Sequence, residues 1–220
     1  GLTLKHTATA DDKPIVLTLQ TGETDMAADD VMGKIAFQAP DEGTGTDAIL
    51  VSAAIQAVSE GDFSSSANAT RLEFMTGASE AAATKMTLTS AGDVGIGTTA
   101  PECELHVFKA SSGADTDGSA VVHIENSGTT LLQLSAGTSS DCHIAFGDSG
   151  NQNIGSIAYL NNGNALAFRT DNSEKMRLTS AGNLSLLADA SVLSFGANSE
   201  VTLTHVHDVG LTLKHTATAD

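Results

Sequence analysis

The stretch Lys85–Val107, KMTLTSAGDVGIGTTAPECELHV, constrains the fold more than any other part of the sequence. Gly92 can adopt the positive φ of a tight turn, and Asp93 beside it can hydrogen-bond to its own backbone. Pro101 cannot donate a hydrogen bond to a ladder, so it belongs to a corner between strands. The alternating residues around these breaks predict short strands. We expect the strands at Met86–Thr89, Val94–Gly97 and Glu104–Phe108.

The sequence repeats itself at two scales. GLTLKHTATAD at Gly1–Asp11 returns letter for letter at Gly210–Asp220, a displacement of 210 − 1 = 209 residues. Inside that interval, KMTLTSAGDV at Lys85–Val94 has a counterpart in KMRLTSAGNL at Lys175–Leu184. The eleven identical residues indicate one unit of a tandem array, and the alternative is a monomer whose two ends pair.

Each half of the long unit is predicted to be a meander of short strands. The first half, residues 1–104, ends in the SAGDVGIGTTAP module, and the second, residues 105–209, ends in SAGNL and THVHD. Residues 210–220 begin the next unit. Alternation also predicts strands at Leu2–His6 and Ile15–Gln20. The residues expected to shape the turns and corners are Gly92, Asp93, Gly95, Gly97, Pro101, Gly182 and Asn183.

The module at Lys85–Val107 resembles one that recurs in the shafts of phage tail fibres and tailspikes, and in related bacterial surface fibres. The matching residues are Met86, Leu88, Ser90, Gly92, Asp93, Val94, Gly95, Ile96, Gly97, Thr98, Thr99, Pro101, Leu105, His106 and Val107. The second copy matches only the first part, because Leu184–Ala190 departs from VGIGTT. The self-cleaving chaperone domain that often follows such shafts has no counterpart in this sequence.

These observations predict an all-β fold, a repetitive fibrous shaft of short strands. A meander alone would leave one face apolar and its edges bare, and repeats avoid this by stacking on neighbours. The resemblance implies that the shaft is an intertwined parallel homotrimer. The alternative is a single-chain β-solenoid, which predicts a regular period of about 20–30 residues that the sequence does not show.

Composition excludes several classes of partner. The formal net charge is −17 and only 10 residues are Lys or Arg, so we expect no binding to nucleic acid. No apolar run has membrane-spanning length, so we expect no membrane insertion. Cys103 and Cys142 are too few for a disulfide framework and are expected to pack as small apolar residues, although a bridge between them stays open.

The segment Thr204–Asp208 is the one candidate metal site in the sequence. In a strand, His205 and His207 would point to the same side, and a threefold axis would gather six imidazoles. Six imidazoles suit Fe, Ni or Co, and some phage tail fibres resemble this arrangement. The alternative is that both rings are exposed or hydrogen-bonded locally. Calcium is less expected, because the acidic clusters match no calcium-binding loop pattern.

The sequence therefore predicts a structural protein, with no catalytic residue and no residue that binds an organic cofactor. We expect an extracellular fibre shaft on a phage tail or cell surface. It would contact a host receptor only through a tip that this sequence lacks. One alternative is a bacterial adhesin or filament stalk without a phage connection. Another is a glycan-binding or glycan-cleaving tailspike module, which the scarcity of aromatic residues (seven Phe, one Tyr, no Trp) disfavours.

Overall fold

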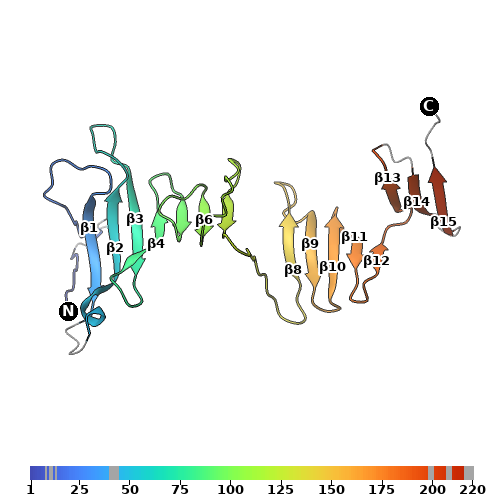
Figure 1. Ribbon diagram of the computed structural model, residues 1–220, viewed down its shortest axis with the longest axis horizontal. Helices are drawn as coiled ribbons and strands as arrows, with labels where there is room; N and C mark the ends of the chain where they lie inside the picture. The colour runs from blue at the N-terminus through green and yellow to red at the C-terminus, as the bar shows by residue number, and fades with distance from the viewer. Residues whose placement is uncertain are drawn as a thin grey trace. The chain divides into compact units, whose positions relative to one another are not determined.

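A computed structural model of the chain describes residues 1–7, 9, 12, 14–39, 45–197, 201–206 and 210–215 (Figure 1). In the last two ranges it describes the backbone, and side chains only at 202–204. The chain divides into two compact units, Gly1–Leu131 and Leu132–Asp220. Apart from a 3-10 turn at Asp47–Ile49, the regular elements of the described residues are strands, which confirms the predicted all-β class. None of the described residues forms a helix with the length and hydrophobicity needed to cross a membrane.

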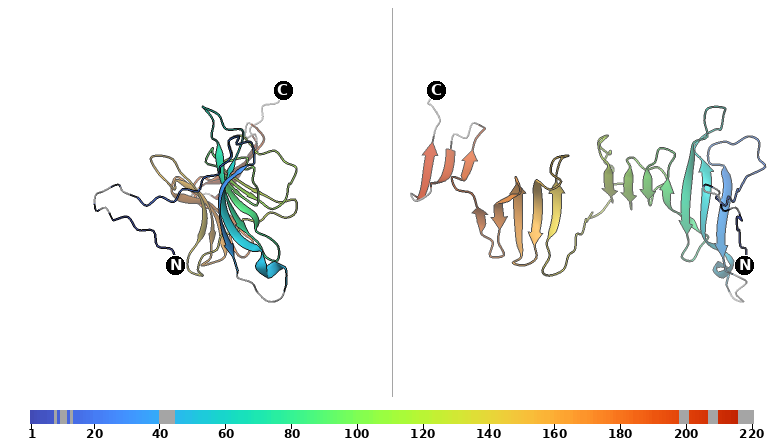
Figure 2. Two further views of the ribbon diagram at one scale, coloured as in Figure 1. Left: turned by 90° about the vertical axis from the view of Figure 1, so that its left-hand side faces the viewer. Right: turned by 180° about the vertical axis from the view of Figure 1, so that it is seen from behind.

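The first unit contains one seven-stranded sheet whose spatial order follows the sequence. Its strands are β1 (Val31–Gln38), β2 (Val51–Ser59), β3 (Thr70–Thr76), β4 (Ala83–Leu88), β5 (Val94–Ile96), β6 (Leu105–Phe108) and β7 (Val122–Glu125). Pairing is antiparallel from β1 to β5 and parallel from β5 to β7. The strands at the β1 end are the longer ones, with nine residues in β2, whereas β5 has three and β6 and β7 have four each (Figures 1 and 2).

The second unit contains two antiparallel sheets. The five-stranded sheet comprises β8 (Cys142–Phe146), β9 (Gly155–Leu160), β10 (Ala165–Thr170), β11 (Ser173–Leu178) and β12 (Leu184–Leu186). The three-stranded sheet comprises β13 (Val192–Phe195), β14 (Val201–Val206) and β15 (Gly210–His215). The buried apolar cluster of the five-stranded sheet is small, because it consists of Leu160 and the alanines of one face, Ala158, Ala165 and Ala167.

Two of the predicted strands are wrong for this chain. Residues 2–6 and 15–20 form no strand in the structure, although both alternate in sequence as a strand does. Residues 1–6, which include the first of these segments, have the same sequence as β15, which pairs with β14 along its whole length. The same six residues are therefore a strand at 210–215, where they pair with β14, and are not a strand at 1–6, because a strand depends on its ladder.

One face of the seven-stranded sheet is polar and nevertheless covered. Cross-strand pairing places one residue of each strand from β2 to β7 in a single row on this face. The row consists of Gln56, Glu73, Thr87, Gly95, His106 and His123. Four of its members are buried, and the other two are half-buried. Buried polar side chains need hydrogen-bond partners, so the contacts within this row matter for stability.

Glu73 has the most complete set of partners in the row. Its carboxylate accepts hydrogen bonds from Gln56 Nε2 (2.8 Å), Arg71 Nε (2.8 Å) and Thr84 Oγ1 (2.9 Å). Arg71 also pairs with Asp29 at 2.8 Å. Burial by itself raises the pKa of Glu73, but the hydrogen bonds from these three side chains favour the charged form, and the pKa is lowered overall.

The two TSAG turns have the same hydrogen bonds. In the first, Gly92 N donates to Thr89 O (3.1 Å), and Asp93 N donates to the Thr89 hydroxyl (3.1 Å). In the second, the corresponding bonds from Gly182 N and Asn183 N to Thr179 measure 2.9 and 3.2 Å. Both glycines have positive φ, 96° and 81°. Each turn is therefore defined by two features: the hydrogen bonds to the threonine before it and the positive φ of the glycine inside it.

The corner after β5 admits no side chain at its second glycine. Gly97 has φ of 83°, and a Cβ added there would lie 2.1 Å from the carbonyl oxygen of Phe108. Its amide donates to Lys85 O at 2.9 Å. Backbone of β4, β6 and the corner thus meet at one residue, which only glycine fits.

Gly97→Ala is expected to lower the free energy of unfolding by about 2 kcal/mol or more, because the new methyl group forces the Phe108 backbone away and strains φ. Urea unfolding at a fixed chain concentration measures the change. Gly118→Ala is the matched control, since nothing lies within 4 Å of a Cβ built there. Equal losses in the two variants would contradict this account of the corner.

Glu73→Gln is expected to lower the free energy of unfolding at neutral pH by about 1–3 kcal/mol, because the substitution removes a buried charge-assisted network. The folded-state pKa of Glu73 is lowered, so its contribution is present above the ordinary value of 4.5 and is lost as pH falls through the folded-state value. The difference in free energy of unfolding between the unmodified chain and Glu73→Gln should therefore decrease as the pH is lowered. Glu23→Gln, on an exposed side chain, is the control. A difference in free energy of unfolding that does not depend on pH would contradict the role of the charge.

Candidate functional site

The face opposite the polar row is apolar, and in the seven-stranded sheet it is continuous from edge to edge. Strand alternation places a large apolar side chain at the same register position in every strand. We call this row the first apolar ladder; it consists of Ile35, Ile55, Phe74, Met86, Ile96, Val107 and Ile124. A parallel row two residues along the strands contains Leu72, Leu88, Val94, Leu105 and Val122.

The five-stranded sheet repeats the arrangement. Its pairing aligns a second apolar ladder, which consists of Ile144, Ile157, Phe168, Met176 and Leu186. The order of residue types, with Phe followed by Met in the next strand, matches Phe74 and Met86 of the first ladder. The sequence similarity between the two halves is thus also a similarity of sheet register.

Both ladders remain open to solvent within one chain. Exposed fractions are 44% for Ile35, 38% for Phe74 and 43% for Ile96, and 47% for Ile144 in the second sheet. A soluble monomer seldom exposes a contiguous row of this size, whereas scattered apolar residues are common. The ladders are therefore candidate interaction surfaces.

An extended segment lies at one edge of the first ladder. A Cβ built on Gly33 of β1 would come within 2.8 Å of the Leu19 side chain, so this segment packs directly on the strand backbone. Leu19, Met32, Ile35, Ile55 and Leu72 line a shallow apolar groove there. Leu19 itself is 46% exposed, so the segment covers only the β1 end of the face and leaves the rest open.

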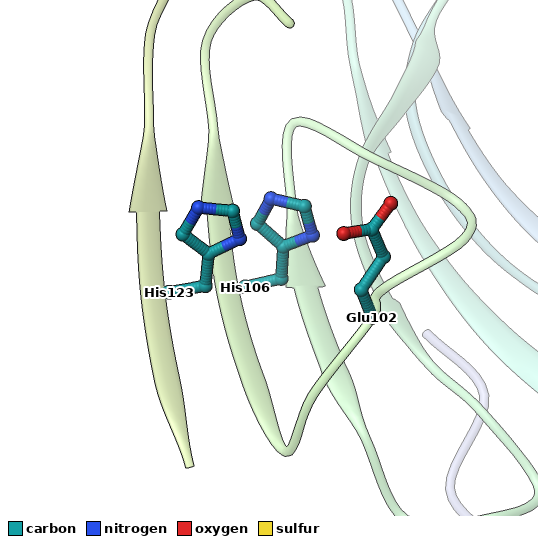
Figure 3. A group of neighbouring side chains, drawn as sticks. All are labelled: Glu102, His106 and His123. Carbon is teal, nitrogen blue, oxygen red and sulfur yellow. The ribbon is translucent and has the colours of Figure 1, made fainter. Parts of the chain in front are cut away.

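A second feature lies on the polar face, where β6 and β7 bring two histidines together. His106 and His123 are directly paired in the parallel register, and their rings stack with centroids 4.8 Å apart and planes 16° apart. Glu102, in the corner before β6, turns its carboxylate toward the ring edge of His106 (Figure 3). One ligand-type atom from each of the three residues lies within 4.8 Å of the other two. We call this group the Glu–His–His cluster.

His106 is the least satisfied member of the cluster. The residue is 2% exposed, and neither of its ring nitrogens forms a hydrogen bond in the described part of the chain. Nε2 lies 3.4 Å from Oε2 of Glu125, which is an ion-pair distance but too long for a formed hydrogen bond. Nδ1 forms no hydrogen bond with any described residue. Burying a polar atom without a hydrogen-bond partner costs folding free energy, so the burial of both His106 ring nitrogens calls for a further role of this residue.

Glu125 is held as an anion behind His106. Its Oε1 accepts hydrogen bonds from the backbone amide (2.5 Å) and the hydroxyl (2.8 Å) of Ser112. The amide hydrogen bond and then the hydroxyl hydrogen bond lower the pKa of Glu125. The second carboxylate oxygen, Oε2, is the one that faces His106.

Thr116 links the two remaining members. Its hydroxyl contacts Nδ1 of His123 at 2.6 Å and forms a short hydrogen bond with the carboxylate of Glu102. With Glu102 ionised, the hydroxyl donates to the carboxylate and accepts the Nδ1 proton of His123. The polar groups of the cluster thus converge on one point between the corner and the β6–β7 connection.

The structure places the predicted site residues as follows. His207 lies outside the described residues, and only the backbone of His205 is described, within β14, so a metal site there stays a prediction. Cys103 is buried and Cys142 half-buried, and both are free thiols. Of the turn residues, Gly92, Gly97 and Gly182 have positive φ, and a Cβ on Gly95 would lie 2.5 Å from the Thr98 carbonyl oxygen.

The sequence did not reveal the Glu–His–His cluster, because the one metal site that it predicted lies at His205 and His207. The two residues are 123 − 106 = 17 positions apart, with no short spacing that signals a metal site. One available signal was the pair of similar runs LHVF and VHIE, which place each histidine between apolar residues of two strands.

Comparisons with known proteins give a fold similarity only. No protein-family model matches the chain, and no curated protein sequence matches it. Among solved structures, the chain is similar to the carboxy-terminal domain of the bacteriophage T5 L-shaped tail fibre, at 13% identity and a TM-score of 0.44 over 90% of this chain and 94% of that one. The same domain with its intra-molecular chaperone domain gives 13% identity and a TM-score of 0.46, over 100% of this chain and 69% of that one. No functional assignment rests on this similarity.

Proposed function

We propose that this chain is a segment of an extracellular fibre shaft, assembled with other copies of itself through the two apolar ladders. Its task would be mechanical: to hold a receptor-binding or adhesive tip away from a virion or cell surface. The single observation that carries the proposal is the first apolar ladder, an unbroken row of large side chains left open across seven strands.

The chemistry of the open face favours a second copy of the chain as its partner. Removing a large aliphatic side chain from water contributes about 1.5–3 kcal/mol at full burial, so several half-exposed members of one row supply a substantial driving force. The overall charge of −17 makes copies repel one another elsewhere on their surfaces. Association of copies would therefore proceed through the apolar faces, where no charged side chain belongs to either ladder.

The resemblance of the Lys85–Val107 module to fibre shafts supports three chains wound in parallel. Three copies of the seven-stranded sheet, with their apolar faces turned inward, would bury the first ladder, and three copies of the five-stranded sheet would bury the second in the same way. The polar row would then face outward under its covering loops, which agrees with its existing burial inside a single chain. A homotrimer satisfies the open face of every copy equally.

End-to-end continuity follows from the repeated ends. Residues 1–6 have the sequence of β15, and β15 is the third strand of the sheet that closes the second unit. In a tandem array, each such strand would be followed by the segment that leads into the next seven-stranded sheet. The three-stranded sheet would therefore lie at the junction between consecutive units.

Val122→Asp is expected to weaken self-association, because Val122 lies on the apolar face and is 54% exposed in the single chain. Val121→Asp is the matched control: it is the neighbouring valine, 61% exposed, but it precedes β7 and belongs to neither apolar row. Sedimentation and native mass spectrometry measure the assembly. We expect trimers for the unmodified chain and for Val121→Asp, and a shift to monomers for Val122→Asp.

Phe74→Asp, at the centre of the first ladder, should shift the assembly further toward the monomer. A monomeric unmodified chain at all accessible concentrations would overturn the proposal, and so would equal assembly of the Val121 and Val122 variants.

A further inference from the structure

We propose that Glu102, His106 and His123 bind a divalent first-row transition metal ion of the zinc class. This inference stands apart from the proposed assembly, because all three residues come from one chain and the two histidines lie on the polar face of the sheet. It also concerns residues other than His205 and His207.

The donor set selects the class of ion. Two imidazoles and one carboxylate suit zinc and its neighbours, whereas calcium and magnesium prefer oxygen ligands alone. The three donor atoms lie within 4.8 Å of one another. Around a tetrahedral zinc ion, donor atoms are about 3.4 Å apart when each is about 2.1 Å from the metal. Closing the cluster onto an ion therefore requires shifts of about 1 Å, in which the two stacked rings tilt toward each other.

The cluster can make these shifts where they are needed. Glu102 is exposed and belongs to the corner, and His123 is half-buried near the edge of the sheet. His106, the buried member, is already in position with its Nδ1 free of any hydrogen bond in the described residues. A bound ion would supply the partner that this nitrogen lacks.

The surroundings of His106 are those of a metal ligand. Histidine ligands usually direct their second ring nitrogen at a carboxylate, which fixes the tautomer and raises the basicity of the ligating nitrogen. Here Nε2 of His106 faces the Glu125 carboxylate at 3.4 Å, and Ser112 holds that carboxylate in place. Glu125 is thus a positioning residue, and not a ligand.

The hydrogen bonds of Thr116 compete with metal binding at the cluster. Its hydroxyl bridges Glu102 and His123 in the absence of an ion, which satisfies those two side chains but leaves Nδ1 of His106 unpaired. Metal binding would replace the Thr116 contact at His123 Nδ1, and the neutral ring would then carry its proton on Nε2. An ion would also connect the corner to β6 and β7, so binding should stabilise the parallel part of the sheet.

The test is zinc titration of the full chain by calorimetry, with cobalt absorption as a second readout of ligand type. The chain carries His205→Ala and His207→Ala, so that the separate site predicted there does not contribute. We expect one zinc ion per chain and a melting temperature that rises by about 5 °C or more at saturating zinc. The cobalt spectrum should lack a sulfur-to-metal charge-transfer band, because neither Cys103 nor Cys142 belongs to the cluster.

Single substitutions locate the site. His123→Ala and Glu102→Gln should each weaken zinc binding by at least about tenfold. Both side chains are at least partly exposed, so folding should survive, and circular dichroism verifies it. His143→Ala, an exposed histidine of β8, is the matched control and should leave the affinity unchanged. Absence of zinc binding, or equal affinity in all three variants, would overturn the proposal. Sedimentation of the same samples reports assembly separately.

Discussion

The structure depends on how each sheet divides its two faces. In the seven-stranded sheet, the side bearing Glu73, Thr87 and His106 is covered, and the side bearing the first apolar ladder is open. This is the reverse of a globular β protein, in which the apolar face is the one that loops and other sheets cover. In this chain the covered face is the polar one, and the apolar face is left open within the single chain.

Because the apolar faces are open, a single chain has little buried apolar surface and more of its local order comes from polar contacts. The buried apolar cluster of the five-stranded sheet contains three alanines and one leucine, which is a small hydrophobic contribution for five strands. Specific polar contacts, such as the three hydrogen bonds to Glu73 and the bonds of the two TSAG turns, carry more of the local order. Assembly through the ladders, as proposed, would add the missing apolar burial.

Local features of the sequence predicted local features of the fold. The SAG turns, the Gly97 corner and the strands β4 to β6 follow from glycine, proline and alternation, which act over a few residues. The match of Lys85–Val94 with Lys175–Leu184 anticipated the corresponding places of Met86 and Met176 in the two ladders. What the sequence did not reveal depends on register across long connections. His106 and His123 meet only because β6 and β7 pair in parallel with that exact alignment. The segments at 2–6 and 15–20 show the opposite failure, since alternation predicts a strand but cannot supply the neighbouring edge.

The identity of residues 1–6 with β15 has a consequence for how such a chain can change in length. Loss or duplication of a whole 209-residue interval, as happens when matching DNA segments recombine, would leave β14 beside the same six residues as before. Only a change by a fraction of the interval would put a foreign sequence on that edge. If the chain is a repeating unit of a fibre, as proposed, the fibre could therefore change in length by whole units while the pairing of β14 with this sequence is kept.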